Sequence, residues 1–156
     1  MELNLPDAAV RLHVDAWDWR DAVRQAGEAL SAAGVTDPSY THEMITVVET
    51  LGPYIVIAPG IALAHARPSQ AVHRAGCSWV TLARPVAFGN ADNDPVSIVV
   101  GLAAVDHDGH VDMMAALAAV LADPDKMSLA MQATTAAQLR EALKNPDGNT
   151  QEKDKQ

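Results

Sequence analysis

The sequence contains one cysteine and few aromatic residues. Cys77, the single cysteine, excludes an internal disulfide and a zinc site built from four cysteines. It lies in an apolar, strand-like segment, so we expect it to be buried. Aromatic residues make up only 4% of the chain, although 49% of its 156 residues are hydrophobic. The core of this single domain must therefore consist mainly of Ala, Val, Leu, Ile and Met side chains.

Basic residues are also few. The chain has 11 Lys and Arg against 20 Asp and Glu, a formal net charge of −9. This balance disfavours nucleic acid and anionic membrane surfaces as partners and favours a basic protein partner. Solubility alone explains the same charge, so both interpretations stay open at this point.

Long apolar runs are missing as well. No segment reaches 18 uninterrupted apolar residues, and residues 1–6 carry neither a basic start nor a long apolar stretch. We therefore expect a soluble, cytoplasmic protein without direct membrane insertion.

The segment 59–68 combines strand signals with chemically active residues. The apolar, β-favouring runs 54–57 and 61–63 are bracketed by Gly and Pro, as short strands and their turns are. His65 would then lie just past a strand end, where open α/β sheets place ligand-handling groups. An imidazole can act as a nucleophile near neutral pH, and Arg67 could steady an incoming anion such as a phosphoryl group. A structural histidine bonded to loop backbone fits the same spacing.

Capping signals and helical spacing recur along the rest of the chain. The helices are expected at 16–33, 37–51, 106–121, 123–131 and 135–144. Asp15 is the expected cap of the first helix, and Asp108 that of the third, which places His110 in the first turn. The predicted core stripes include Leu51 on the second helix and Val111 on the third.

The strands complete the predicted fold. They are expected at 54–57, 61–63, 75–82 and 96–105, all after the first two helices. Residues 1–144 should therefore form one α/β domain, a small mixed β-sheet flanked by helices on both faces. The polar, apolar-free segment 145–156 is expected to be a disordered tail.

Three motifs follow one another in the chain. They are Pro59-Gly60-Ile61-Ala62-Leu63-Ala64-His65-Ala66-Arg67-Pro68, then Phe88-Gly89-Asn90-Ala91-Asp92-Asn93-Asp94-Pro95-Val96, then Asp106-His107-Asp108-Gly109-His110-Val111. In this order they resemble the cytoplasmic IIA components of the bacterial phosphoenolpyruvate-dependent sugar phosphotransferase system (PTS), type 2, the fructose/mannitol superfamily. The middle motif most resembles the ascorbate-type branch, and the similarity runs from about residue 38 to residue 143.

The resemblance implies a phosphotransferase component that carries phosphohistidine. A phosphoryl group from the carrier protein HPr would pass to Nε2 of His65 and then to a cysteine of a IIB component, which serves a IIC membrane transporter. Nδ1 of His65 should then donate to a backbone carbonyl. His110 would bond a phosphoryl oxygen or orient the ring, and Arg67 is a weaker candidate for phosphate contact. No cofactor and no metal is required, and a homodimer is compatible with the family.

Two departures from the family pattern concern this site. Ala64 stands where family members commonly have proline, so the chain before His65 is expected to be less rigid. Glu49 stands near a position where mannitol-type relatives tend to carry arginine, which predicts a different phosphate environment.

The acidic residues around His110 need a separate explanation. Asp106, Asp108 and Asp112 would repel a phosphoryl dianion if they faced it. We therefore expect them to point into helix caps and solvent.

Two other functions stay open. One is a regulatory IIA-like protein of the nitrogen-related kind, phosphorylated on His65 but controlling other proteins. The other is a metal-binding hydrolase that uses the cluster 106–112, although the chain has no HExxH spacing and the acidic residues fit helix capping equally well. The remaining histidines are expected to be surface or local structural residues: His13, His42, His73 and His107.

Overall fold

The computed structural model describes residues 3–144, so the predicted tail at 145–156 lies outside the described residues. A five-stranded sheet forms the centre, in the order β1-β4-β5-β3-β2. Its strands are β1 (Val10–Val14), β2 (Val56–Ala58), β3 (Ile61–His65), β4 (Gly76–Val86) and β5 (Val96–Ala103). β1 runs parallel to β4 and β3 parallel to β5, while the other two pairs are antiparallel. The predicted mixed sheet is confirmed.

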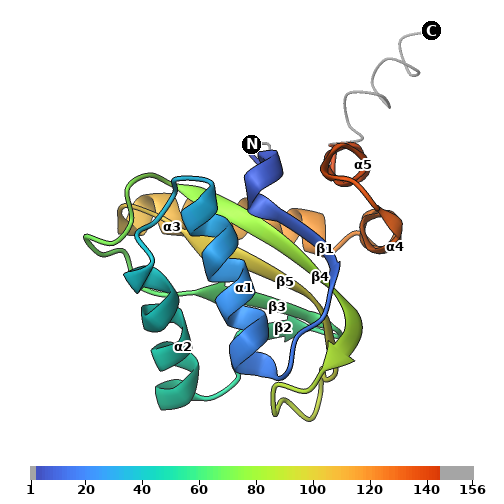
Figure 1. Cartoon of the computed structure of the whole chain (residues 1–156), viewed down its shortest axis with the longest axis horizontal. Helices are drawn as coiled ribbons and strands as arrows, with labels where there is room; N and C mark the ends of the chain where they lie inside the picture. Colours follow the sequence, from blue (N-terminus) through green and yellow to red (C-terminus); the bar gives the residue numbers. More distant parts are fainter. Residues whose placement is uncertain (1–2, 145–156) are drawn as a thin grey trace, which may run out of the picture.

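Helices cover both faces of this sheet, as predicted (Figure 1). They are α1 (Trp19–Ala32), α2 (Ser39–Leu51), α3 (His107–Leu121), α4 (Pro124–Gln132) and α5 (Ala136–Ala142), after a short 3-10 turn η1 (Asp7–Ala9). One core cluster joins α1 and α2 to the sheet, and a second joins α3, α4 and α5 to its other face. None of the helices within residues 3–144 is both long and apolar enough to cross a membrane.

The largest differences from the predicted strands are at β1 and β4. The edge strand β1 was missed, because Arg11 and His13 interrupt its short apolar pattern and its residues are at most half-buried. β4 was expected to end before Arg84 and Pro85 but continues to Val86. Its register with β5 is irregular beyond Thr81, and proline, which lacks an N–H, is tolerated where the ladder is already interrupted.

Two predicted helix caps were also wrong. Asp18, not Asp15, caps α1, and Asp106, not Asp108, caps α3, where its carboxylate accepts the Gly109 N–H at 2.7 Å. An N-cap residue has extended backbone and sits just before the first helical turn. Each predicted aspartate has a second aspartate two or three positions away, so spacing alone did not separate the candidates.

The core contains most of the predicted residues, with two exceptions. Leu51 and Val111 are 67% and 49% exposed, so their assignment to core stripes was wrong. Val48 is the buried residue near the end of α2. On α3 the buried residues are Leu117 and Leu121, while Met113 and Met114 in its first half are partly buried against the same core cluster.

Cys77 is buried, as predicted, and burial raises the pKa of its thiol to about 12. The thiol therefore stays protonated at neutral pH and behaves as a packing group.

A row of small residues crosses the middle of the sheet beneath α1. Ala64 on β3, Gly101 on β5 and Ser78 on β4 are neighbours in register. The Ser78 hydroxyl donates to the Ala26 carbonyl of α1 at 2.8 Å. A Cβ atom added at Gly101 would lie 2.4 Å from Ser78 Oγ and 3.3 Å from the Ala26 carbonyl oxygen. The absence of a side chain at Gly101 therefore lets α1 approach the strand that pairs with His65.

Replacing Gly101 with alanine is expected to destabilise the fold by about 1–3 kcal/mol, the usual cost of overpacking a core. Denaturant unfolding measures this difference. The closest atom is Ser78 Oγ, so the same change should cost less in a Ser78→Ala background. Additive costs in the double variant would contradict this explanation.

Candidate functional site

His65 is the last residue of β3, not a residue just past the strand end as predicted. Its neighbour in register on the parallel strand β5 is Leu102. Side chains alternate along a strand, so His65 shares a face with Ile61 and Leu63, which pack in the cluster of α3, α4 and α5. The site therefore lies on the α3 side of the sheet.

The topology brings His110 to the same place. Parallel strands end at the same edge of a sheet, and only three residues separate the end of β5 from the start of α3. The first turns of α3 therefore stay at the edge where β3 ends. The ring centroids of His65 and His110 are 5.4 Å apart with an interplanar angle of 55°. The two motif histidines thus meet, as expected.

A backbone hydrogen bond fixes the orientation of the His65 ring. Nδ1 lies 2.8 Å from the carbonyl oxygen of Leu63. A carbonyl oxygen only accepts, so Nδ1 must carry the proton. In the neutral ring the lone pair is then on Nε2. The expected bond from Nδ1 to a backbone carbonyl is confirmed.

His110 is held neutral beside His65. Burial lowers the pKa of His110 below its ordinary value, and the nearby His65 and His107 rings lower it further. Its Nδ1 is buried and has no hydrogen-bond partner among residues 3–144. A buried N–H without an acceptor is costly, so Nδ1 is the poorer place for the single proton. This leaves Nε2 as the donor.

A pocket of about 250 Å³ opens over these rings. The residues that line it are Val47, Leu51, Tyr54, His65, Ala66, Arg67, Pro68, His107 and His110. The Tyr54 ring meets the His65 ring edge-on, with centroids 5.9 Å apart and an angle of 89°. Tyr54 and His107, whose rings line the pocket beside the two motif histidines, were not predicted as part of the phosphoryl-transfer site. The spacing of His107 and His110, three apart on one helix, was the available signal for His107.

Arg67, the predicted phosphate contact, is exposed and lines the pocket. It forms no ion pair with any other residue in the described part of the chain. Its guanidinium is therefore available to an anion in the pocket.

The acidic residues turn away, as expected. Asp106 caps α3, while Asp108 and Asp112 are exposed, and none of the three lines this pocket. Glu49 does not line it either, and its carboxylate pairs with Arg20 of α1 at 3.0 Å.

The middle motif, residues 88–96, is bonded to the segment between α2 and β2. The Asp94 carboxylate accepts the N–H groups of Phe88, Gly89 and Asn90 at 2.8–3.1 Å. Asn93 donates to the Val56 carbonyl at 3.1 Å, and Asn90 donates to the same oxygen and to the Pro53 carbonyl at 3.3–3.4 Å. This loop therefore fastens the turn that carries Tyr54, and none of its side chains lines the pocket.

Residues 3–144 contain no group of three or more His, Cys, Asp or Glu side chains placed to hold a metal ion. The ligand set that a metal-dependent hydrolase would need at 106–112 is therefore not assembled.

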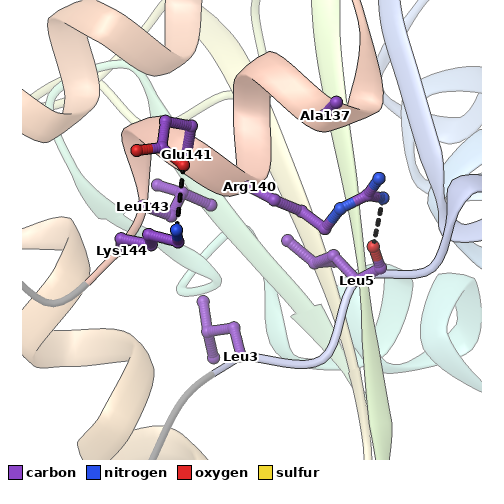
Figure 2. Close-up of a pocket in the computed structure, with 7 residues that line it drawn as sticks. All are labelled: Leu3, Leu5, Ala137, Arg140, Glu141, Leu143 and Lys144. Atoms are coloured by element: carbon purple, nitrogen blue, oxygen red, sulfur yellow. Dashed lines mark hydrogen bonds and ion pairs between the residues drawn. The ribbon is translucent and has the colours of Figure 1, made fainter.

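A second pocket, of about 350 Å³, lies between the N-terminal segment and α5 (Figure 2). The charged side chains that line this pocket form hydrogen bonds and ion pairs with other residues of the chain. Figure 2 shows that Arg140 donates to the Leu5 carbonyl at 2.9 Å and that Lys144 pairs with Glu141. Arg140 also donates to Asp7. No histidine or cysteine lines it, so the pocket over His65 is the better candidate for chemistry.

Comparison with known proteins identifies the family of the chain. Residues 4–146 match the family described as phosphoenolpyruvate-dependent sugar phosphotransferase system, EIIA 2. The ascorbate-specific PTS system EIIA component of Escherichia coli K12 is 43% identical over 105 residues, 67% of this chain and 68% of that protein. The same figures hold for the ascorbate-specific component of Salmonella typhimurium LT2.

Two solved structures share the fold. The mannitol-specific cryptic phosphotransferase enzyme IIA CmtB from Escherichia coli has a TM-score of 0.79 at 27% identity, covering 89% of this chain and 94% of that chain. IIA mannitol from Escherichia coli has a TM-score of 0.79 at 25% identity, covering 90% and 99%. The predicted fold class and family are confirmed: the chain belongs to the EIIA 2 family of the phosphoenolpyruvate-dependent sugar phosphotransferase system.

Proposed function

We propose that His65 is the residue on which this chain, a phosphocarrier of the sugar phosphotransferase system, holds the phosphoryl group. One observation carries the proposal. The bond from His65 Nδ1 to the Leu63 carbonyl fixes the tautomer, and it leaves Nε2 with the lone pair that a nucleophile needs. The phosphoryl group would therefore be attached at Nε2.

The transfer consists of one bond made and one bond broken at phosphorus. The Nε2 lone pair of His65 attacks the phosphorus atom of phosphohistidine on HPr, and the P–N bond to that donor breaks with its electron pair returning to the donor ring. Such a reaction needs alignment and charge stabilisation more than further covalent chemistry. The Nε2–H of His110 would donate to a phosphoryl oxygen, and Arg67 would supply positive charge.

The surroundings of the pocket suit protein donors and acceptors. Leu51 and Tyr54 on its wall are 67% and 48% exposed, and Val105 and Val111 beside the start of α3 are 52% and 49% exposed. Exposed apolar side chains grouped around reactive residues are typical of protein docking surfaces. HPr as donor and a cysteine of a IIB component as acceptor fit this surface, and both would meet the chain in the cytoplasm.

Sugar specificity would be determined by a later component of the system. The IIC transporter, not this chain, would bind it. Because relatives named as ascorbate-specific are 43% identical to this chain, we assign its IIB and IIC partners to ascorbate uptake.

The test is phosphorylation of the full chain with phosphoenolpyruvate, enzyme I and HPr. Intact mass should increase by one phosphoryl group, and acid should remove it, because phosphohistidine is acid-labile. Omitting HPr is the control and should leave the mass unchanged. An unmodified chain in the presence of an HPr that phosphorylates another IIA protein would refute the proposal.

The protein that accepts the phosphoryl group from this chain distinguishes a role in transport from a role in regulation. An ascorbate-type IIB component should discharge the phosphorylated chain, and a mannitol-type IIB component should do so more slowly. Phosphorylation without discharge by any IIB component would instead support the regulatory, nitrogen-type alternative.

A further inference from the structure

Tyr40 connects the site to the core through its hydroxyl. It is the second residue of α2, and its side chain is completely buried. The hydroxyl oxygen lies 2.8 Å from the Leu102 carbonyl oxygen, 3.0 Å from the Ala66 nitrogen and 3.2 Å from the Ala66 carbonyl oxygen. A phenol has one proton, so the hydroxyl donates to the nearer carbonyl, that of Leu102, and accepts the Ala66 N–H.

These partners flank the nucleophile on two strands. Ala66 directly follows His65, and Leu102 is the neighbour of His65 in register on β5. The pairing of β3 with β5 ends at this neighbour, so the next backbone groups have no strand partner there. The Tyr40 hydroxyl takes the place of the missing ladder bonds. Burial raises the pKa of Tyr40 to about 12, so the hydroxyl keeps its proton at neutral pH.

We propose that Tyr40 is a positioning residue for phosphoryl transfer: its hydroxyl fixes the backbone on both sides of the strand end, so that Nε2 of His65 faces the pocket. This inference rests on the proposed function of His65. Tyr40 does not line the pocket and acts only through the backbone around His65. The bond from His65 Nδ1 to the Leu63 carbonyl depends on the same backbone geometry.

The hydroxyl can be removed without removing the ring. Phenylalanine fills the same space in the core but leaves the Ala66 N–H and the Leu102 carbonyl without this partner. Ser78→Ala is the matched control, because it also removes a buried hydroxyl that donates to a backbone carbonyl, that of Ala26, at 2.8 Å. Ser78 does not line the pocket over His65, and its hydroxyl bonds neither Ala66 nor Leu102, so Ser78→Ala should leave kcat unchanged.

Rapid-quench transfer from phosphorylated HPr measures the effect. Tyr40→Phe is expected to lower kcat by roughly 10- to 100-fold with little change in KM for HPr, since a small misplacement of a reacting group costs this much. Nitrogen NMR of the His65 ring is expected to show a mixture of tautomers in place of Nδ1–H alone. Wild-type kcat and wild-type ring signals in folded Tyr40→Phe would overturn the proposal.

If Tyr40→Phe does not fold, a measurement on the wild-type chain still tests the proposal. In the wild type the Ala66 amide proton is expected to exchange slowly, because the Tyr40 hydroxyl accepts it. Exchange as fast as that of exposed amides would overturn the proposal. Both NMR readings are made on the unphosphorylated chain, so they test Tyr40 even if His65 accepts no phosphoryl group.

Discussion

Replacing His65 with alanine is expected to abolish phosphorylation by HPr completely. The bond from His65 Nδ1 to the Leu63 carbonyl leaves Nε2 unprotonated and fixes the orientation of the ring. His110 is a poor substitute, because the nitrogen of its ring that lacks the proton is buried. Intact mass of the variant after incubation with phosphoenolpyruvate, enzyme I and HPr should show only the unmodified chain.

His42→Ala is the matched control for this loss. His42 is exposed on α2 and does not line the pocket over His65. This variant should accept one phosphoryl group at the wild-type rate. An acid-labile phosphate on His65→Ala at the wild-type level would show that another histidine is the carrier, and peptide mapping would then identify it.

Replacing His110 with alanine is expected to slow transfer without preventing it. His110 would supply a hydrogen bond to a phosphoryl oxygen, and the loss of one such donor lowers a rate constant by roughly 10²- to 10³-fold. Stopped-flow or quenched mixing with phosphorylated HPr should show this slow phase, and the final phosphate content should still reach one group per chain. A complete loss equal to that of His65→Ala would mean that the two roles are wrongly assigned.

His107→Ala is the companion variant, because His107 lines the same pocket but has no assigned contact with the phosphoryl group. Its effect on the rate should be smaller than that of His110→Ala. Equal effects would show that both rings of α3 contact the phosphoryl group.

The pKa of His110 gives a second readout on the same variant. The folded chain holds this pKa below the ordinary value of 6.5, first through burial and then through His65 and His107. The unfolded chain therefore binds the proton more readily, and His110 destabilises the fold as the pH falls below 6.5. Denaturant unfolding between about pH 7 and pH 5 should show a smaller loss of stability in His110→Ala than in the wild type.

The sequence predicted the layers of the fold because the relevant signals are local. Short apolar runs between Gly and Pro marked β3, and apolar residues such as Val23 and Leu30 marked the core face of α1. β1 escaped because Arg11 and His13 give an edge strand a polar appearance. The helix caps could not be chosen from spacing, since an extended backbone, not the residue type alone, distinguishes Asp106 from Asp108.

Only the site residues that belong to the sequence motifs were predicted. His65, His110 and Arg67 were found through the motifs, and the pocket brings them together. Tyr54 was missed because it belongs to a turn, and its contact with His65 depends on the pairing of β2 with β3. Leu51 was assigned to the core because its spacing on α2 is helical, yet its position at the end of the helix exposes it beside the histidines.

Basic residues are sparse at the pocket over His65, and this affects the free energy of the phosphorylated state. Arg67 is the only Arg or Lys among the described residues that line the pocket, and neither Arg20 nor its partner Glu49 is among them. Strong charge neutralisation would turn the phosphorylated chain into a thermodynamic trap, because tight binding of the ground state raises the barrier to the next step. The free energy of phosphoryl transfer from the donor to a phosphocarrier, and from the phosphocarrier to the acceptor, must therefore be close to zero. The sparse positive charge around His65 suits a protein that receives a phosphoryl group only to release it.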